Sequence, residues 1–175
     1  MSPASYYFRF YVAREMVHAG LGDLYVQELK PWRDMLAMGL STWAETPEPT
    51  RSDSHAWSAH PTFDLMTIVA GIEPGSPDFA TVAITPHLGP LHNVAVTMPT
   101  AHGTVETKYS REGNNWTAQI TLPAGLAGTF EVRRQDVADV DPEVLGVQGE
   151  FDALLGGVRA RHHLHAQCRR GIQLS

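Results

Sequence analysis

The chain has 175 residues, 43% of them hydrophobic and 18% charged, which is the composition of an ordinary globular protein. Its formal net charge of −6 argues against a nucleic-acid-binding protein, because such proteins need a concentrated basic surface. The single cysteine, Cys168, excludes an internal disulfide framework. No apolar run approaches the roughly 20 residues needed to span a bilayer, and the N-terminus lacks the apolar core of a signal peptide. We therefore expect no nucleic acid or membrane as partner, and a cytoplasmic location by default.

The first part of the chain is predicted to be helical. Aromatic and aliphatic residues recur every three or four positions over 6–17, which indicates a helix whose aromatic side chains we interpret as core. A second helical pattern over 21–38 contains Pro31, so we expect a kink or a break there. The very short connection between these two patterns predicts an αα-hairpin. A third helix is expected over 56–70.

From Phe79 onward the hydrophobic period changes to two, which is typical of strands. Five short strands at near-regular spacing predict an antiparallel β-sandwich. We expect these strands at 81–85, 92–98, 103–109, 116–122 and 127–133. The remainder has no clean period, although 145–158 could form a weak helix. The predicted fold class is therefore α+β, with a helical domain at 1–75, an antiparallel β-sandwich domain at 76–134 and an atypical, partly disordered tail at 135–175.

The segment 40–61, which connects the second and third helical patterns, concentrates aromatic rings, carboxylates and imidazoles, and it contains three prolines. Long irregular loops in compact domains are usually functional or disordered. An aromatic wall can raise the pKa of a neighbouring carboxylate by desolvation, which suits acid–base catalysis, and flat aromatic faces stack on sugar rings. Glu45 is the candidate carboxylate, and the alternative is that it caps a helix or pairs with Arg51. We interpret the segment as half of a carbohydrate site.

Other polar residues of this segment have simpler interpretations. Asp53 and Ser54 are typical N-terminal caps of the helix that follows them. His55 and His60 lie five positions apart, whereas a helical metal pair prefers four. Trp57 is interpreted as a core residue unless His55 faces the site and Trp57 supports it. The segment therefore predicts no metal site.

A histidine-rich run at 162–165 is a second place where a metal could bind adventitiously. Apart from Cys168, no carboxylate or cysteine near this run completes a coordination geometry. We favour a solvated tail, and we predict neither a metal nor a cofactor for the chain.

Several ordered motifs resemble the C-terminal end of the α-L-rhamnosidases. They are Thr42-Trp-Ala-Glu45, Ser52-Asp-Ser-His-Ala-Trp-Ser-Ala-His-Pro61, Val69-Ala-Gly-Ile72 and the continuation Phe79 to Gly89. The resemblance covers about residues 4–134, whereas 135–175 do not resemble the usual ending of this family. It implies the last helices of a six-hairpin (α/α)6 toroid, followed by the antiparallel β-domain.

The resemblance also implies a reaction and a ligand. Members are inverting hydrolases, in which an acid and a base lie roughly 6.5–9.5 Å apart on opposite sides of the bond. Glu45 matches the general base and His55 a histidine that contacts rhamnose, with Trp43 and Trp57 as walls or supports. The general acid of the family lies upstream of the matched segment. We therefore expect a rhamnose-containing glycoside as ligand and no hydrolysis by this chain alone.

Two other hypotheses remain open at this point. The chain could be a non-catalytic carbohydrate-binding or structural β-sandwich module, which would not use Glu45, or a metal-binding protein through its histidine-rich tail. In addition, the aromatic face at 6–11 could drive self-association if no other helix covers it.

Overall fold

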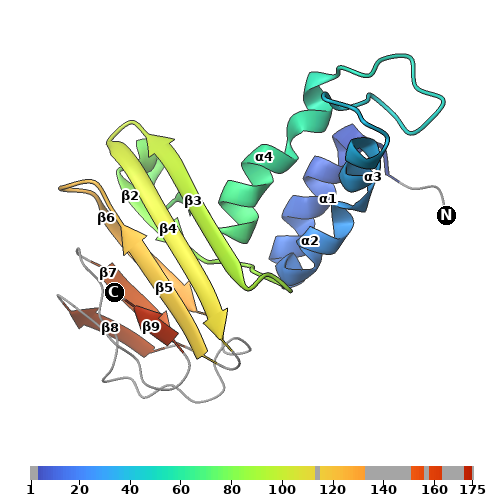
Figure 1. The fold of residues 1–175 in the computed structure, drawn as a ribbon. Coiled ribbons are helices and arrows are strands. Elements are labelled where there is room, and N and C mark those ends of the chain that lie inside the picture. The colour runs from blue at the N-terminus through green and yellow to red at the C-terminus, as the bar shows by residue number, and fades with distance from the viewer. Residues whose placement is uncertain (1–3, 113–114, 133–150, 156–157, 163–171, 175) are drawn as a thin grey trace.

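The structure is a computed structural model, and it describes residues 4–112, 115–132, 151–155, 158–162 and 172–174. A group of short helices lies beside one end of a two-sheet β-sandwich (Figure 1). This mixture of helices with largely antiparallel sheets agrees with the predicted α+β class. In the part of the chain that the structure describes, no helix has the length and apolarity needed to cross a membrane.

The predicted αα-hairpin is present, and its second arm is broken. Helix α1 (Tyr6–His18) begins after Ser5, whose hydroxyl accepts a hydrogen bond from the Phe8 amide. The second arm consists of η1 (Gly22–Leu24), α2 (Tyr25–Glu28) and α3 (Lys30–Ala37). Pro31 lies in the first turn of α3, where its missing amide hydrogen costs nothing. The predicted break at this proline is therefore confirmed.

The segment 56–70 is helical but not a single α-helix, which corrects the prediction. It consists of the 3-10 turn η2 (Ala56–Ala59), α4 (Pro61–Asp64) and the π-helical turn η3 (Leu65–Val69). Pro61 has no amide hydrogen, so a new helix begins there rather than continuing from η2. At the other end, the Ala70 amide donates to the Leu65 carbonyl five residues earlier, which is the hydrogen bond of a π-helix.

All five predicted strands are present, with small changes in their ends. They are β2 (Thr81–Ile84), β3 (Asn93–Thr100), β4 (Gly103–Glu112), β5 (Asn115–Thr121) and β6 (Ala127–Val132). A short strand that was not predicted, β1 (Ile72–Pro74), precedes these five. It pairs with β2, and the 3-10 turn η4 (Pro77–Phe79) connects the two.

The two sheets are not purely antiparallel. Strands β3, β4 and β5 pair antiparallel in one sheet, whereas β2 and β6 pair in parallel in the other. Three strands of alternating direction separate β2 from β6 along the chain, so β6 returns to the first sheet in the direction of β2. The prediction of an antiparallel sandwich is therefore correct for β3–β5 and wrong for this crossover.

The C-terminal segment contributes β7 (Phe151–Leu155), β8 (Val158–His162) and β9 (Ile172–Leu174). The weak helix expected over 145–158 is therefore wrong at Phe151–Leu155, because this segment pairs with β6 at an edge that would otherwise expose backbone groups. Of the predicted histidine run, His162 ends β8, and the rest, like Cys168, lies outside the described residues.

One continuous core joins the helices to the sheets. Alternate residues of β4, Val105, Thr107 and Tyr109, are buried, as expected for a strand with one face in the core. The same hydrophobic cluster contains residues of α1 and α2 and the segment 68–72. The hydroxyl of Tyr109 donates to the Ala70 carbonyl over 2.9 Å, which ties β4 to the end of η3. The sandwich therefore holds the C-terminal end of the segment that follows the candidate loop.

Candidate functional site

The loop between α3 and α4 folds back on itself as an irregular hairpin at the end of the helices remote from the sheets (Figure 1). The Glu45 amide donates to the Ser52 carbonyl, and the His55 amide donates to the Trp43 carbonyl, each over 2.8 Å. These two backbone bonds align the arms of the loop. As a result, Glu45 and His55, ten positions apart in the sequence, lie on the same side of the loop.

The carboxylate of Glu45 is buried and paired with a guanidinium group. Glu45 is only 5% exposed, and its two oxygens accept hydrogen bonds from Nε and from a terminal nitrogen of Arg51. These hydrogen bonds hold the pKa of the Glu45 carboxyl below its ordinary value, in spite of the opposing effect of desolvation. The pairing with Arg51 is the alternative that the sequence left open. The net result is a lowered pKa, whereas an apolar wall without Arg51 would raise it.

His55 lies between the carboxylate and an exposed aromatic ring. Its Nδ1 is 4.0 Å from Oε2 of Glu45, and its ring centre is 4.0 Å from that of Trp57. Trp57 is 43% exposed, which excludes the interpretation that it is a core residue. The structure thus brings Glu45, His55 and Trp57 together as a surface with a polar end and an aromatic end.

Trp43 lies on the other arm of the loop and has a different environment. It packs against a small hydrophobic cluster of Tyr6, Trp32, Met35 and Ala44, which anchors the loop to α1 and α3. The Ala44 amide also donates to the sulfur of Met35. Trp43 is therefore placed to support the loop.

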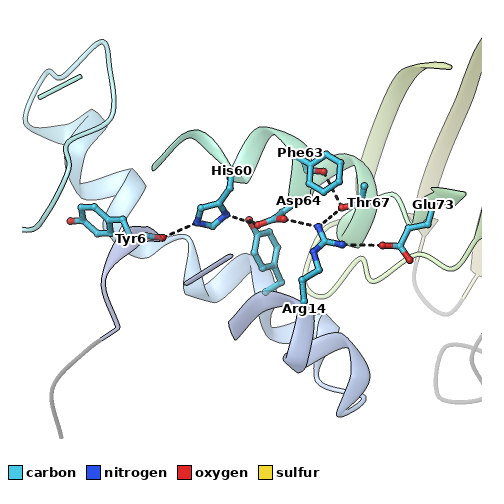
Figure 2. A network of polar contacts seen from close by, with 8 residues as sticks. Tyr6, Arg14, His60, Phe63, Asp64, Thr67 and Glu73 are labelled. Carbon is cyan, nitrogen blue, oxygen red and sulfur yellow. Dashed lines mark hydrogen bonds and ion pairs between the residues drawn. The ribbon is translucent and has the colours of Figure 1, made fainter. Parts of the chain in front are cut away.

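A buried polar network fixes the other end of the loop, and Figure 2 shows its members. Asp64 of α4 accepts hydrogen bonds from Arg14, over 2.7 Å, and from the Tyr25 hydroxyl, over 3.0 Å. The Nδ1 atom of His60 lies 2.6 Å from the same carboxylate, and its Nε2 lies 3.2 Å from the Tyr6 carbonyl. Three helices therefore meet at one buried carboxylate.

The structure also shows where the other polar residues of this segment lie. His60 faces Asp64, whereas His55 faces Glu45, so the two histidines do not converge on a common metal. Among the described residues, no group of three or more His, Cys, Asp or Glu side chains could hold a metal ion. The N-cap of η2 is His55, without a side-chain hydrogen bond, so Asp53 and Ser54 are not its caps. Their backbone carbonyls instead accept hydrogen bonds from hydroxyls within the loop.

Sequence reasoning identified Glu45, His55 and Trp57 but missed the aromatic residues next to them. Tyr7 of α1 lies beside Trp57, with a distance of 5.6 Å between ring centres, and it was interpreted as part of the core. Tyr7 and Tyr11 are exposed, whereas Tyr6 is buried. The heavy aromatic content of this helix was a signal, but it does not say which aromatic side chains face solvent.

Arg51→Gln is expected to raise the pKa of Glu45 toward its ordinary value, because the guanidinium stabilises the carboxylate form. A lowered folded-state pKa contributes stability above the unfolded pKa, and this stability is lost as the pH falls through the folded-state pKa. The stability difference between wild type and Arg51→Gln should therefore shrink in acid. A ¹³C NMR titration of the Glu45 side chain measures the pKa. Lys108→Gln, on β4, is the control, and an unchanged pKa in Arg51→Gln would contradict the role of this pair.

Comparisons with known proteins bear on the identity of the chain. Residues 71–144 match the family model described as the bacterial alpha-L-rhamnosidase C-terminal domain. The fold is similar to the crystal structure of a GH78 family rhamnosidase of Bacillus sp. GL1, with a TM-score of 0.62 and 23% sequence identity. That similarity covers 72% of this chain, which spans only 16% of the length of the Bacillus protein. No curated protein matches the chain. The resemblance to the C-terminal portion of the α-L-rhamnosidase family is therefore confirmed, by the family-model match over residues 71–144 and by the similar fold of the Bacillus protein.

Proposed function

We propose that this chain is the C-terminal portion of an inverting α-L-rhamnosidase-like hydrolase that cleaves terminal α-L-rhamnosyl linkages. One observation carries the proposal: the buried Glu45 carboxylate lies beside the imidazole of His55, which in turn contacts the exposed ring of Trp57. A carboxylate can activate water, an imidazole can hydrogen-bond to sugar hydroxyls, and an aromatic face can stack on a sugar ring. Helices α1–α4 would be the last helices of the toroid.

In this proposal Glu45 is the general base and Arg51 keeps it ionised. A base must be deprotonated before it can accept a proton from water, and the lowered pKa of Glu45 meets this condition at neutral pH. Arg51 donates one hydrogen bond to each carboxylate oxygen, and each oxygen keeps a lone pair that can accept a hydrogen bond from water. Its side chain is 80% exposed, and it can therefore swing into solvent without disturbing the core.

The inverting mechanism needs a second carboxylic acid across the glycosidic bond, roughly 6.5–9.5 Å from the base. Glu48 and Asp53 belong to the same loop as Glu45, and a single hairpin is badly suited to place two carboxyl groups on opposite faces of a sugar. We therefore place the general acid outside this chain and expect the chain alone to bind a rhamnoside without cleaving it.

The purified chain is expected to release no rhamnose from p-nitrophenyl α-L-rhamnoside, yet L-rhamnose should shift the NMR signals of the Trp57 indole and the His55 imidazole. His55→Ala should weaken this binding by about tenfold, the loss of roughly one hydrogen bond to a polar ligand. D-Glucose serves as the control ligand. Measurable hydrolysis, or shifts confined to the β-sandwich, would contradict the proposal.

The catalytic role of Glu45 needs a polypeptide that also carries the acid. When the chain is combined with the upstream helices of an α-L-rhamnosidase toroid, Glu45→Gln should lower kcat by about 10²–10⁴-fold and leave rhamnose binding intact. Glu48→Gln is the matched control, because it removes a carboxylate from the same loop. Equal turnover in both variants would exclude Glu45 as the base.

A second candidate function is a sandwich module that binds carbohydrate without catalysis. A hollow over β3–β5 favours it, because polar side chains of these strands line that surface, among them Asn93, Lys108, Ser110 and Gln119. Figure 1 shows this sheet remote from the loop between α3 and α4, so the two sites are separable by NMR mapping. Shifts at Lys108 and Gln119, with none at Trp57, would favour the module.

A further inference from the structure

A row of aromatic side chains extends the candidate site onto α1. We define the aromatic row as His55, Trp57, Tyr7 and Tyr11. Successive ring centres are 4.0 Å apart for His55 and Trp57, 5.6 Å for Trp57 and Tyr7, and 5.6 Å for Tyr7 and Tyr11. The row therefore begins next to the Glu45 carboxylate and continues onto a different helix.

The outer part of the row has both apolar faces and polar groups in contact with solvent. Tyr7 is 47% exposed and Tyr11 is 45% exposed, and their hydroxyls are 2.9 Å apart in a mutual hydrogen bond. Tyrosine offers a flat apolar face together with a hydrogen-bonding group, a combination that suits a ligand with rings and hydroxyls. Two adjacent hydroxyls contribute nothing to hydrophobic packing, so they favour a ligand that carries polar groups.

The order of the residues along the row suggests which part of a ligand each would meet. A terminal rhamnose whose anomeric carbon is attacked by water from Glu45 must lie against His55 and Trp57. Tyr7 lies next to Trp57, with 5.6 Å between the ring centres, so we expect it to lie beyond that sugar. The next part of a rhamnoside is the group linked through the glycosidic oxygen, and in many glycosides this group is a second sugar or an aryl ring.

We propose that Tyr7 binds the ring attached to the terminal rhamnose, by stacking its exposed face on a sugar or aryl ring. Tyr11 is a positioning residue, because its hydroxyl orients the Tyr7 ring through their hydrogen bond. This inference rests on the proposed function, since it takes the rhamnose position from Glu45 and His55. It adds a residue that determines selectivity for the aglycone, contributed by α1 rather than by the loop.

The test uses the full chain and three ligands: methyl α-L-rhamnoside, which has no attached ring, p-nitrophenyl α-L-rhamnoside, and a rhamnosyl-glucose disaccharide. Titrations follow the Trp57 indole signal by NMR. Tyr7→Ala should weaken binding of the two ring-bearing ligands by roughly twofold to tenfold, the range for one aromatic stacking contact. Binding of methyl α-L-rhamnoside should stay unchanged. A response with either ring-bearing ligand supports the inference and identifies the class of ring.

Two variants serve as controls. Phe8→Ala removes a ring that is also exposed on α1 but contacts Tyr11 rather than Trp57, and it should leave all three affinities unchanged. Tyr7→Phe keeps the stacking face but loses the hydrogen bond to Tyr11, so its affinity for the ring-bearing ligands should lie between those of wild type and Tyr7→Ala. Thermal unfolding of Tyr7→Ala checks that the fold is intact.

The possible failures are distinguishable. If Tyr7→Ala binds all three ligands as wild type does, the inference about Tyr7 is overturned and the proposed function stands. If no rhamnoside shifts the His55 or Trp57 signals of the wild-type chain, the proposed function itself fails. If sedimentation velocity finds a wild-type dimer that Tyr7→Ala dissociates, the row is an interface between copies, which also overturns the inference.

Discussion

Asp64→Asn is expected to lower the free energy of unfolding by about 3–5 kcal/mol, the typical cost of breaking a buried ion pair by removing one partner. Asp64 is completely buried, and Arg14, Tyr25 and His60 all contact its carboxylate (Figure 2). An asparagine has the same shape but no charge, and its NH2 group can only donate. The guanidinium would therefore lose its buried counter-charge, and only one oxygen would remain to accept the hydrogen bonds that two oxygens accept in Asp64.

Urea denaturation at neutral pH measures the effect, because the free energy of unfolding falls linearly with urea concentration. Asp34→Asn is the matched control: this aspartate pairs with Lys30 on the exposed face of α3 and should change stability by less than about 0.5 kcal/mol. The pKa of the Tyr25 hydroxyl is a second readout. Burial and the Asp64 carboxylate both hold this pKa above its ordinary value, so Asp64→Asn should lower it. A loss of stability no larger in Asp64→Asn than in Asp34→Asn would mean that the network does not hold the three helices together.

The network also explains why the candidate site keeps its shape in a small helical group. His60 follows η2 directly, and its two ring nitrogens contact the Tyr6 carbonyl and Asp64. Trp32 donates its indole hydrogen to the Ser58 carbonyl within the same turn. The turn that carries Trp57 is therefore held on both sides by buried hydrogen bonds, and His55 is fixed at its start. Asp64→Asn should accordingly weaken rhamnose binding as well as stability.

The fold could be predicted from the sequence wherever a local rule applied. The period-two alternation located β2–β6, and Pro31 located the break between α2 and α3, because both signals come from neighbouring residues. The strand β1 was missed, since its three residues include a proline and have no alternation long enough to detect. The parallel pairing of β2 with β6 was also missed, because pairing across the sandwich depends on where three intervening strands place the chain.

The candidate site shows the same division between local and long-range information. Motif resemblance pointed to Glu45 and His55, but only the fold of the loop puts their side chains 4.0 Å apart. The direction of the Glu45 pKa shift could not be predicted from the sequence. Desolvation raises this pKa and pairing with Arg51 lowers it, and their balance depends on geometry. The role of Asp64 was not foreseen at all. Its partner Arg14 lies 50 positions away in the sequence, and no local pattern connects them.

The second large effect is expected from Gly71→Ala, which should destabilise the fold by roughly 4 kcal/mol or more, at the upper end of single-residue effects. Gly71 connects η3 to β1 and has a φ of +73°, a conformation that costs a non-glycine residue about 1–2 kcal/mol. In addition, a Cβ atom at this position would overlap the backbone carbonyl of Thr85. The two segments cannot move apart freely, because the Thr85 amide donates to the Gly71 carbonyl over 3.0 Å.

Gly39→Ala separates the two contributions to this effect. Gly39 ends α3 with a φ of +85°, but no atom lies within 4 Å of the position that its Cβ would occupy. Gly39→Ala should therefore lower the free energy of unfolding only by the cost of the positive φ, about 1–2 kcal/mol. Urea denaturation of both variants measures the difference, which reports how closely the backbone of η3 approaches the sandwich. If both variants lose the same stability, the junction tolerates a methyl group and the helices are not fixed to β2 at this point. If Gly71→Ala loses far more stability than Gly39→Ala, the end of the candidate segment is anchored in the same core as the family-matched domain. A mutation in that domain can then disturb the loop that carries Glu45.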